Sequence, residues 1–384
     1  MAANNFGTLI TSVQANLDTV LREQIGFIPA VWKNTTAAQA AYGQQIQYPI
    51  VPTMTAEDAA ADCCDFPCAD GDTWGVGQMV LDHNRRVSFC YTGEDDASIR
   101  NSYNGNADEM RNLTVQQAVR TLVNEVEASI AALAPQASQV YTPANTTLFS
   151  TQADNIKDLT LIRKLLIDNN TPDDGDLHLV MNTLSGAQVR NLYNITRANE
   201  NASNVTLRTG NLLELLGFGL HESKFANQNI ASGTGTGYLV NGAASAGART
   251  VTVDTGTGTI LTGQKVTFAG NTGVYTVASY AANVITLNQD LTGAIADNAA
   301  VTLGAGPVSG QLALHRHAIV LASRAPYIQG GRDRATNRAY ITDPMSGLTM
   351  MLSEYPGYRA NSFELSLIWG VKMVKPEMAV YIPQ

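Results

Sequence analysis

The residues with the most evident chemical potential in this chain are four cysteines gathered in one stretch. Cys63, Cys64, Cys68 and Cys90 all fall between residues 45 and 95. Zinc sites favour two closely spaced cysteine pairs, and Cys90 has no close mate. Adjacent cysteines have poor geometry for bonding to each other. We expect free thiols; disulfides formed late, within or between subunits, and a metal site are the alternatives.

Two histidines lie two positions apart. His315 and His317 fall in Leu312–Ala322, whose apolar character predicts a strand. Side chains at i and i+2 of a strand share a face, so the pair could hold a metal. No acidic or cysteine motif converges on them, and we expect an ordinary strand. The other histidines are isolated in the sequence: His83, His178 and His221.

Motifs of catalysis and nucleotide binding are missing. The sequence contains no Gly-x-Ser-x-Gly, His-Glu-x-x-His or Gly-Lys-Ser/Thr. The repeat Gly233–Gly237 lacks the spacing of a dinucleotide fingerprint. Asp173–Asp176 lacks the acid pattern of an EF-hand loop and predicts a tight turn. We therefore expect no enzyme, no catalytic residue, no cofactor and no metal.

Charge is sparse over the whole chain. Charged residues make up 15%, compared with about 25% in ordinary soluble domains, which indicates that partners cover much of the surface. The net charge of −9 argues against direct nucleic-acid binding. No apolar run approaches the roughly 20 residues that span a bilayer, and no secretory signal is evident. We expect a protein that stays in a cytoplasm or leaves by lysis.

Like charges cluster in two places. A stretch without Lys or Arg carries seven acids: Glu57, Asp58, Asp62, Asp65, Asp70, Asp72 and Asp82. Such a run is usually a solvated loop. It could also dock on a basic surface of a neighbouring copy, for which the candidates are Arg332, Arg334 and Arg338.

Helices and strands must position these residues. Apolar spacings of three and four predict helices over residues 8–25, 112–134, 155–168 and 186–194. In the second, Thr114 and Gln117 match a capping box. Its length, about 20 residues at 1.5 Å each, makes a rod of roughly 30 Å. Strands are expected at 177–181, 212–220, 312–322, 363–374 and 378–382.

Residues 45–95 predict a long hairpin-like loop. Ile46, Tyr48 and Ile50 alternate on the way out. An alternating run returns at Val87–Tyr91.

Residues 232–304 differ from the rest of the chain. They are rich in Gly and Thr, and alternating runs predict a small all-β domain dropped into a host domain. Five runs make this pattern: Thr250–Val253, Val266–Phe268, Tyr275–Val277, Ile285–Leu287 and Val301–Leu303.

Four stretches carry a resemblance to a known family. They are Thr206–Phe218, with Arg208-x-Gly210 and Gly217-Phe218; the runs of 232–304; Leu312–Ile319, with His315-Arg316; and Trp369–Val380, with Pro376-Glu377-x-Ala379-Val380. In this order they resemble the major capsid proteins of tailed bacteriophages, which have the Hong Kong 97-type fold. The podovirus coat proteins with an insertion domain are the most similar.

The resemblance implies an α+β fold divided in the family's manner. Its parts would be an N-terminal arm (1–44), an extended loop (45–100), a peripheral domain with a spine helix (101–144), an axial domain (145–231 and 305–384) and an inserted β domain (232–304). Some members cross-link a loop lysine to an asparagine. Lys33 is the only lysine before Lys157, so we expect no such cross-link.

The resemblance also implies a function. The chain would self-assemble as hexamers and pentamers into an icosahedral head around double-stranded DNA, without specific DNA binding and without membrane contact. Scaffolding and portal proteins, and a decoration protein, would be its partners. It would be assembled in the bacterial cytoplasm and reside in the virion. The alternatives are an encapsulin-like non-viral shell protein and a β-rich surface or carbohydrate-binding protein.

Overall fold

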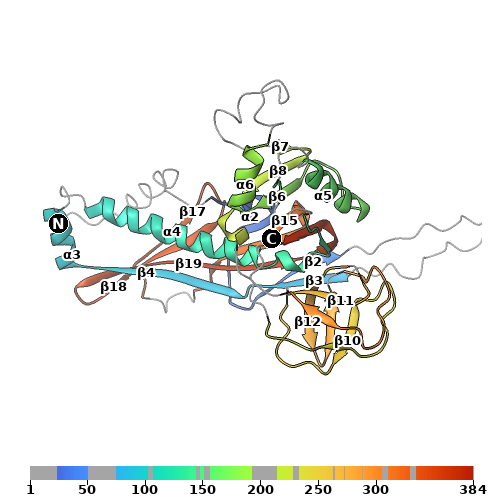
Figure 1. The fold of residues 1–384 in the computed structure, drawn as a ribbon. Coiled ribbons are helices and arrows are strands. Elements are labelled where there is room, and N and C mark those ends of the chain that lie inside the picture. The colour runs from blue at the N-terminus through green and yellow to red at the C-terminus, as the bar shows by residue number, and fades with distance from the viewer. Residues whose placement is uncertain are drawn as a thin grey trace, which may run out of the picture.

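The architecture is seen in a computed structural model, which describes most of the chain. The described residues are 24–50, 75–102, 107–143, 148–150, 156–192, 214–227, 233–304 (without 263, 272 and 288), 310–328 and 334–383. Within them the strands form three six-stranded sheets and one two-stranded hairpin (Figure 1). The helix predicted over residues 8–25 lies outside this part of the chain.

β19 (Ala360–Met373) is the central strand of what we call the long sheet. β4 (His83–Thr92) pairs along one of its edges. β18 (Thr349–Pro356) and β16 (Ile319–Pro326) follow one another along the other edge. Beyond them lie β17 (Asn337–Thr342) and β1 (Trp32–Ala40). At about 3.3 Å per residue, the 14 residues of β19 give the molecule its elongated shape (Figure 1).

α4 (Ala107–Ala131) lies along one face of the long sheet (Figure 1). The predicted helix is confirmed, but it begins five residues earlier than predicted, after α3 (Gly93–Ser102). The capping-box prediction is wrong, because Thr114 lies inside the helix and its Oγ1 donates to the Met110 carbonyl at 2.8 Å. The apolar stripe of the helix is buried as predicted: Val115, Val119, Leu122, Val126 and Ile130.

A second sheet, the compact sheet, holds six shorter strands. In spatial order they are β5 (Gln139–Val140), β20 (Ala379–Pro383), β15 (Gly310–His315), β6 (Leu177–Met181), β8 (Phe218–Glu222) and β7 (Glu214–Leu215). β6 is buried throughout, as its apolar run predicts. α5 (Ile156–Asp168) packs its apolar stripe on this sheet.

α6 (Thr183–Arg190) starts three residues before the predicted helix. The side chain of Asn182 accepts a hydrogen bond from the backbone N–H of Ser185 at 2.7 Å. This N-cap satisfies one of the orphan donors of the first turn, and it sets the start of the helix ahead of the apolar pattern.

The predicted strand over 312–322 is wrong as a single element, because it is two strands in two sheets. β15 belongs to the compact sheet and β16 to the long sheet, with the short 3-10 turn η4 (Arg316–Ala318) between them. The chain crosses again from β19 to β20 through η5 (Pro376–Met378). Both crossings meet where the Ala318 carbonyl accepts the N–H groups of Val374 and Lys375, at 2.9 and 3.2 Å. We call this place the joint.

The predicted hairpin is confirmed in part. β2 (Gln45–Ile50) pairs antiparallel with β3 (Gly75–Val80). The return at Val87–Tyr91 is wrong, because these residues belong to β4, where the Phe89 ring stacks on Phe363 at 5.4 Å. Alternation marks a half-buried strand but does not identify its partner. Residues 51–74 lie outside the described part of the chain.

Residues 233–304 form a third sheet, which we call the Gly/Thr module. Its strands are β9 (Leu239–Val240), β10 (Thr250–Asp254), β11 (Lys265–Phe268), β12 (Tyr275–Ala281), β13 (Val284–Leu287) and β14 (Val301–Leu303). The five predicted strands are confirmed; β9, with two residues, is too short for an alternating pattern. The module buries its own apolar cluster and contacts the 3-10 turn η2 (Ala134–Gln136) after α4.

One buried side chain holds both ends of the Gly/Thr module. The Gln264 side chain is almost completely buried. Its Oε1 accepts the N–H of Gly233 at 3.3 Å, and its Nε2 donates to the Gly304 carbonyl at 3.4 Å. The two ends of the module therefore lie at the same place.

A buried carboxylate ties the N-terminal segment to α4. Glu127 is 1% exposed and accepts the N–H groups of Phe27 and Ile28, at 3.1 and 2.8 Å, where α2 (Phe27–Ala30) begins. It also accepts the Ser223 hydroxyl, next to the turn η3 (Lys224–Asn227), at 3.2 Å. Burial raises the pKa of Glu127, and these donors partly oppose the rise. Three segments far apart in sequence depend on this one group.

We predict that Glu127→Ala lowers the free energy of unfolding by about 2–4 kcal/mol, because buried backbone N–H groups lose their acceptor. Urea denaturation of the unassembled full-length protein measures the loss. The matched control is Glu125→Ala on the same helix, whose exposed carboxylate pairs with Arg85 at 3.3 Å. Its cost should stay below about 1 kcal/mol. Equal small losses in both variants would contradict the role given to Glu127.

Candidate self-association surface

The predicted cysteine cluster falls largely outside the described residues. Cys63, Cys64 and Cys68 belong to 51–74. Cys90 lies in β4 with an exposed, free thiol, opposite Ser362 of β19. The structure therefore places one of the four thiols on the open face of the long sheet and does not test the rest of the prediction.

The arginines and acidic residues predicted to contact each other between copies are described only in part. Arg332 and the acids from Glu57 to Asp72 lie outside the described residues. Arg334 and Arg338 are exposed, the latter in β17. Asp82 is exposed as well, and its Oδ1 lies 2.6 Å from Nδ1 of its own neighbour His83. The proposed contact between copies stays a prediction.

The histidines are less isolated than the sequence indicates. The rings of His315 and His317 stack with centroids 5.5 Å apart, although only His315 is in a strand. The prediction that His178 and His221 are isolated is wrong: β6 and β8 are parallel neighbours and bring His178 Nδ1 within 3.2 Å of His221 Nε2. Strand pairing over 43 residues of chain leaves no local signal in the sequence.

These side chains do not form a metal centre. Across the described ranges, no group of three or more His, Cys, Asp or Glu has the arrangement of a metal site. His315 Nε2 instead lies 3.0 Å from a carboxylate oxygen of Asp174, in the acidic turn before β6. The turn predicted at Asp173–Asp176 thus provides a carboxylate that contacts the His315 ring.

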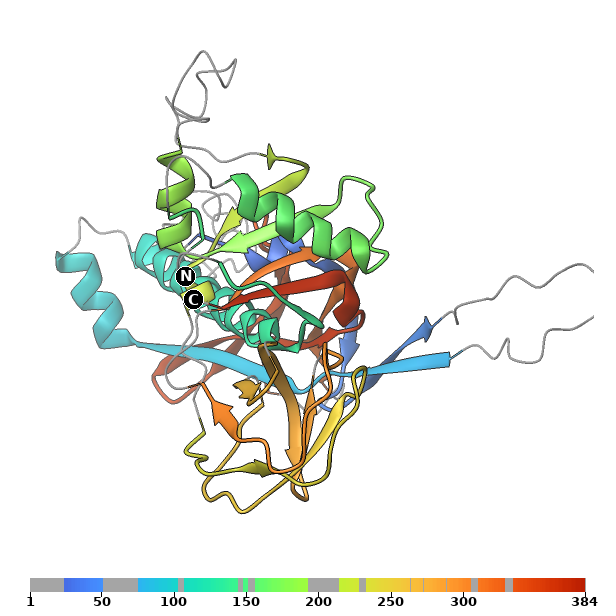
Figure 2. The ribbon, with the colours of Figure 1, turned by 45° about the vertical axis from the view of Figure 1, so that its right-hand side comes forward.

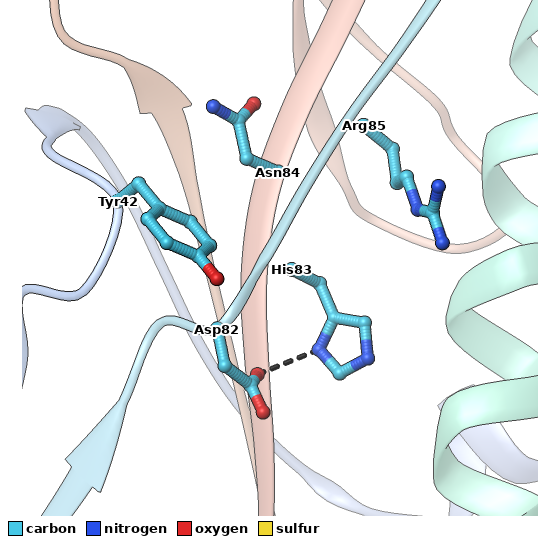
Figure 3. Close-up of a pocket in the computed structure, with 5 residues that line it drawn as sticks. All are labelled: Tyr42, Asp82, His83, Asn84 and Arg85. Carbon is cyan, nitrogen blue, oxygen red and sulfur yellow. Dashed lines mark hydrogen bonds and ion pairs between the residues drawn. The ribbon is translucent and has the colours of Figure 1, made fainter.

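An open hollow of about 450 Å³ lies where the hairpin joins the long sheet (Figure 3). Its lining consists of Tyr42, Asp82, His83, Asn84 and Arg85. The His83 ring stacks on Trp369 of β19, with centroids 5.2 Å apart. Asp82 and His83 form a bonded pair, but the lining offers them no Ser, Cys, Thr or Lys to activate. The hollow lies at the elbow between the hairpin and the long sheet.

The hairpin presents the clearest candidate for contact with another molecule. β2 and β3 project from the body of the protein (Figure 2) and pair only with each other among the described strands. Ile46, Tyr48 and Met79 pack inward at its base. Val76 and Val80 point outward and are 59% and 42% exposed. A two-stranded sheet is marginal in water, and unpaired strand edges invite another chain.

Comparison with known proteins identifies the fold. A solved structure from Mycobacterium phage Che8 is 14% identical, with 94% of this chain and 92% of that chain covered and a TM-score of 0.50. A capsid structure of the cyanophage P-SCSP1u is 11% identical, with 94% and 89% covered and a TM-score of 0.51. This chain has the fold of a phage capsid protein.

The resemblance to phage capsid proteins that the sequence indicated is confirmed at the level of the fold. No protein-family model matches the chain, and no curated protein matches it. At identities this low the likeness concerns the path of the chain and not individual side chains. Both comparisons cover almost the whole of this chain.

We predict that replacing Val76 and Val80 by Asp weakens self-association of this capsid-fold protein at least tenfold, because charges on the outward hairpin face would have to be desolvated on contact. Analytical ultracentrifugation of the full-length protein measures the assembled fraction.

The matched control for this hairpin experiment replaces the same two residues by Thr, which keeps the shape and the strand preference. It should assemble much more like the original protein. Because both positions are exposed, the unfolding free energy of the unassembled Asp variant should change by less than about 1 kcal/mol. Full assembly of the Asp variant would exclude the hairpin face as a contact.

Proposed function

We propose that this chain is a major capsid protein that self-assembles into the icosahedral head of a tailed bacteriophage around double-stranded DNA. The observation that carries the proposal is the capsid fold, shared with the cyanophage capsid structure over 94% of this chain. The exposed, thinly supported hairpin and the 15% charged residues agree with a subunit whose surface neighbours cover. The role is structural and not enzymatic.

The Hong Kong 97-type parts can be assigned within this proposal. Residues 1–44 would be the arm and 45–100 the extended loop, with the β2–β3 hairpin at its base. Residues 101–144 would be the peripheral domain, with α4 as the spine helix. Residues 145–231 and 305–384 would form the axial domain around the compact sheet, and 232–304 the inserted domain. The strands β16, β17, β18 and β19 share an apolar cluster with α4. We therefore propose one change to this division, in which these four strands of 305–384 belong to the peripheral domain instead of the axial domain.

The proposed partners follow from assembly. Other copies would form hexamers and pentamers, with scaffolding and portal proteins and a decoration protein as further partners. The net charge of −9 supports enclosure of DNA without specific binding. Assembly would take place in the bacterial host cytoplasm and lead to the virion. Within the described residues no helix has the length and apolarity to cross a membrane.

We propose that assembly needs no covalent bond. Cys63, Cys64, Cys68 and Cys90 would keep free thiols, with any disulfide forming late. Lys33 is poorly suited to a cross-link between subunits, because its Nζ donates to the Ser346 carbonyl at 3.0 Å. Burial lowers the pKa of Lys33, and Arg316 lowers it further.

Electron microscopy of the full-length protein, expressed alone and together with a candidate scaffolding protein, tests the proposal. Closed icosahedral particles are expected in at least one of the two preparations. Particles from the natural source should hold nuclease-resistant double-stranded DNA. Shells filled with protein cargo would favour the encapsulin-like alternative. Dispersed monomers in both preparations would sink the capsid proposal and leave the surface-protein alternative.

We further propose that Arg332, Arg334 and Arg338 contact the acidic run Glu57–Asp82 of a neighbouring copy. Reversing all three arginines to Glu should reduce the yield of particles several-fold at low salt, because complementary charges fix the register of an interface. The matched control is Lys164→Glu on α5, an exposed cation paired with Asp168 at 2.6 Å. Particle counts by light scattering measure both. Unchanged yield in the triple variant would remove this contact.

A further inference from the structure

Four of the five histidines lie together beside the joint between the compact sheet and the long sheet. His178 is in β6, His221 in β8, His315 at the end of β15 and His317 in η4. His178 and His315 are almost completely buried. The fifth histidine, His83, lies at the elbow of the hairpin (Figure 3) and provides an internal control.

Arg316 connects this group to the joint. It is the first residue of η4, the turn that carries the chain from one sheet to the other. Its Nη2 lies 3.3 Å from His178 Nε2 and 3.4 Å from Asp176 Oδ1. Its backbone N–H donates to the Asp176 carbonyl at 3.2 Å. The guanidinium is therefore held to the β6 end of the compact sheet by one imidazole and one carboxylate.

The hydrogen bonds fix the protonation of the His178 and His221 imidazoles. A guanidinium only donates, so His178 Nε2 must accept and its proton must be on Nδ1. That N–H then donates to His221 Nε2, 3.2 Å away. The arrangement Arg316 to His178 to His221 thus requires two neutral rings with one defined tautomer each.

An added proton cannot be placed in this arrangement without a conflict at Arg316. Protonation of His178 puts an N–H on Nε2, facing the N–H groups of the guanidinium. Protonation of His221 at Nε2 forces His178 to accept on Nδ1 and to carry its own proton on Nε2, with the same result. Either way two donors face each other, and a second positive charge lies next to Arg316.

The charged groups around the pair do not compensate for this conflict. Asp176 faces Arg316, and Asp174 is engaged by His315 at 3.0 Å. His317, on η4, stacks on His315 and makes a tilted ring contact with Trp32 of β1. Lys33 on β1 adds a further positive charge, and its repulsion by Arg316 lowers the pKa of Lys33. Arg316 and Lys33 are already positive, so a protonated imidazole would be a third positive charge beside them. Among these groups only the Asp176 carboxylate favours that charge.

We infer that His178, His221 and Arg316 form an acid-sensitive latch, in which a proton taken up by the imidazole pair releases Arg316 and loosens the joint between the two sheets. The latch belongs to the folded chain itself, so the inference stands apart from the proposed capsid function. It concerns how firmly the compact sheet is held relative to the long sheet.

The titration of the pair agrees with this geometry. Burial lowers the pKa of His178 to about 4, with His221 and Arg316 adding to the effect. Burial and Arg316 also lower the pKa of His221. A depressed histidine pKa stabilises the folded arrangement fully above the unfolded value of about 6.5, and this contribution is lost as pH falls toward the folded value. The latch should therefore hold at neutral pH and open between about pH 5 and pH 4.

Mass-spectrometric exchange of the histidine C2 protons, on the full-length protein, gives a pKa for each ring. His178 should titrate furthest below 6.5. Amide exchange over 310–326, corrected for the intrinsic pH dependence, should show loss of protection below about pH 5. Titration of His178 at or above 6.5, or unchanged protection down to pH 4, would overturn the inference.

Two variants separate the latch from general acid unfolding. In the double variant His178→Gln, His221→Gln the amide at 178 accepts from Arg316 and donates to the amide at 221, and neither side chain titrates, so the acid loosening of 310–326 should disappear. In Arg316→Gln the amide can donate or accept, so the loosening should also disappear while the pKa of His178 rises. His83→Gln should loosen like the original protein. If the variants at the imidazole pair and at Arg316 both lose amide protection at the same pH as the original protein, the latch does not exist.

Discussion

The constraint on which the rest of this structure depends is the pairing of β19 along both of its edges. One edge takes the whole of β4, and the other is divided between β18 and β16. Close contacts of Trp369 and Gly370 in this strand fix the positions of α4 and of the hairpin base. Trp369 donates its indole N–H to the Ser129 hydroxyl of α4 at 3.1 Å. A Cβ on Gly370 would lie 2.3 Å from the Val80 carbonyl, so only glycine lets the hairpin base cross over β19.

Glu127 provides a second fixed point, of a different kind. The pairing of β19 is distributed over many backbone hydrogen bonds, whereas Glu127 concentrates the attachment of α2 in one carboxylate. Burying a charge is unfavourable unless donors surround it, and the backbone N–H groups of Phe27 and Ile28 with the Ser223 hydroxyl meet that need. The sheet therefore sets the shape of the molecule, and the carboxylate sets where the N-terminal segment leaves it.

Much of the local structure could be predicted from the sequence, and most of the spatial arrangement could not. The stripe of α4, the buried run of β6 and the strands of the Gly/Thr module follow from periodicity alone. The division of 312–322 does not, because the apolar pattern continues through Leu314 and Ile319 while the turn between them depends on hydrogen bonds to Asp176 and Val374. The pairing of His178 with His221 depends on strand order, which neither residue reveals.

The Gly/Thr module has a consequence that lies in its two ends. Because Gln264 binds both Gly233 and Gly304, the two ends of the module lie side by side, and the module buries an apolar cluster of its own. A segment with these properties behaves as a cassette. Replacement of the whole segment by another domain would therefore have to match only one pair of adjacent chain ends.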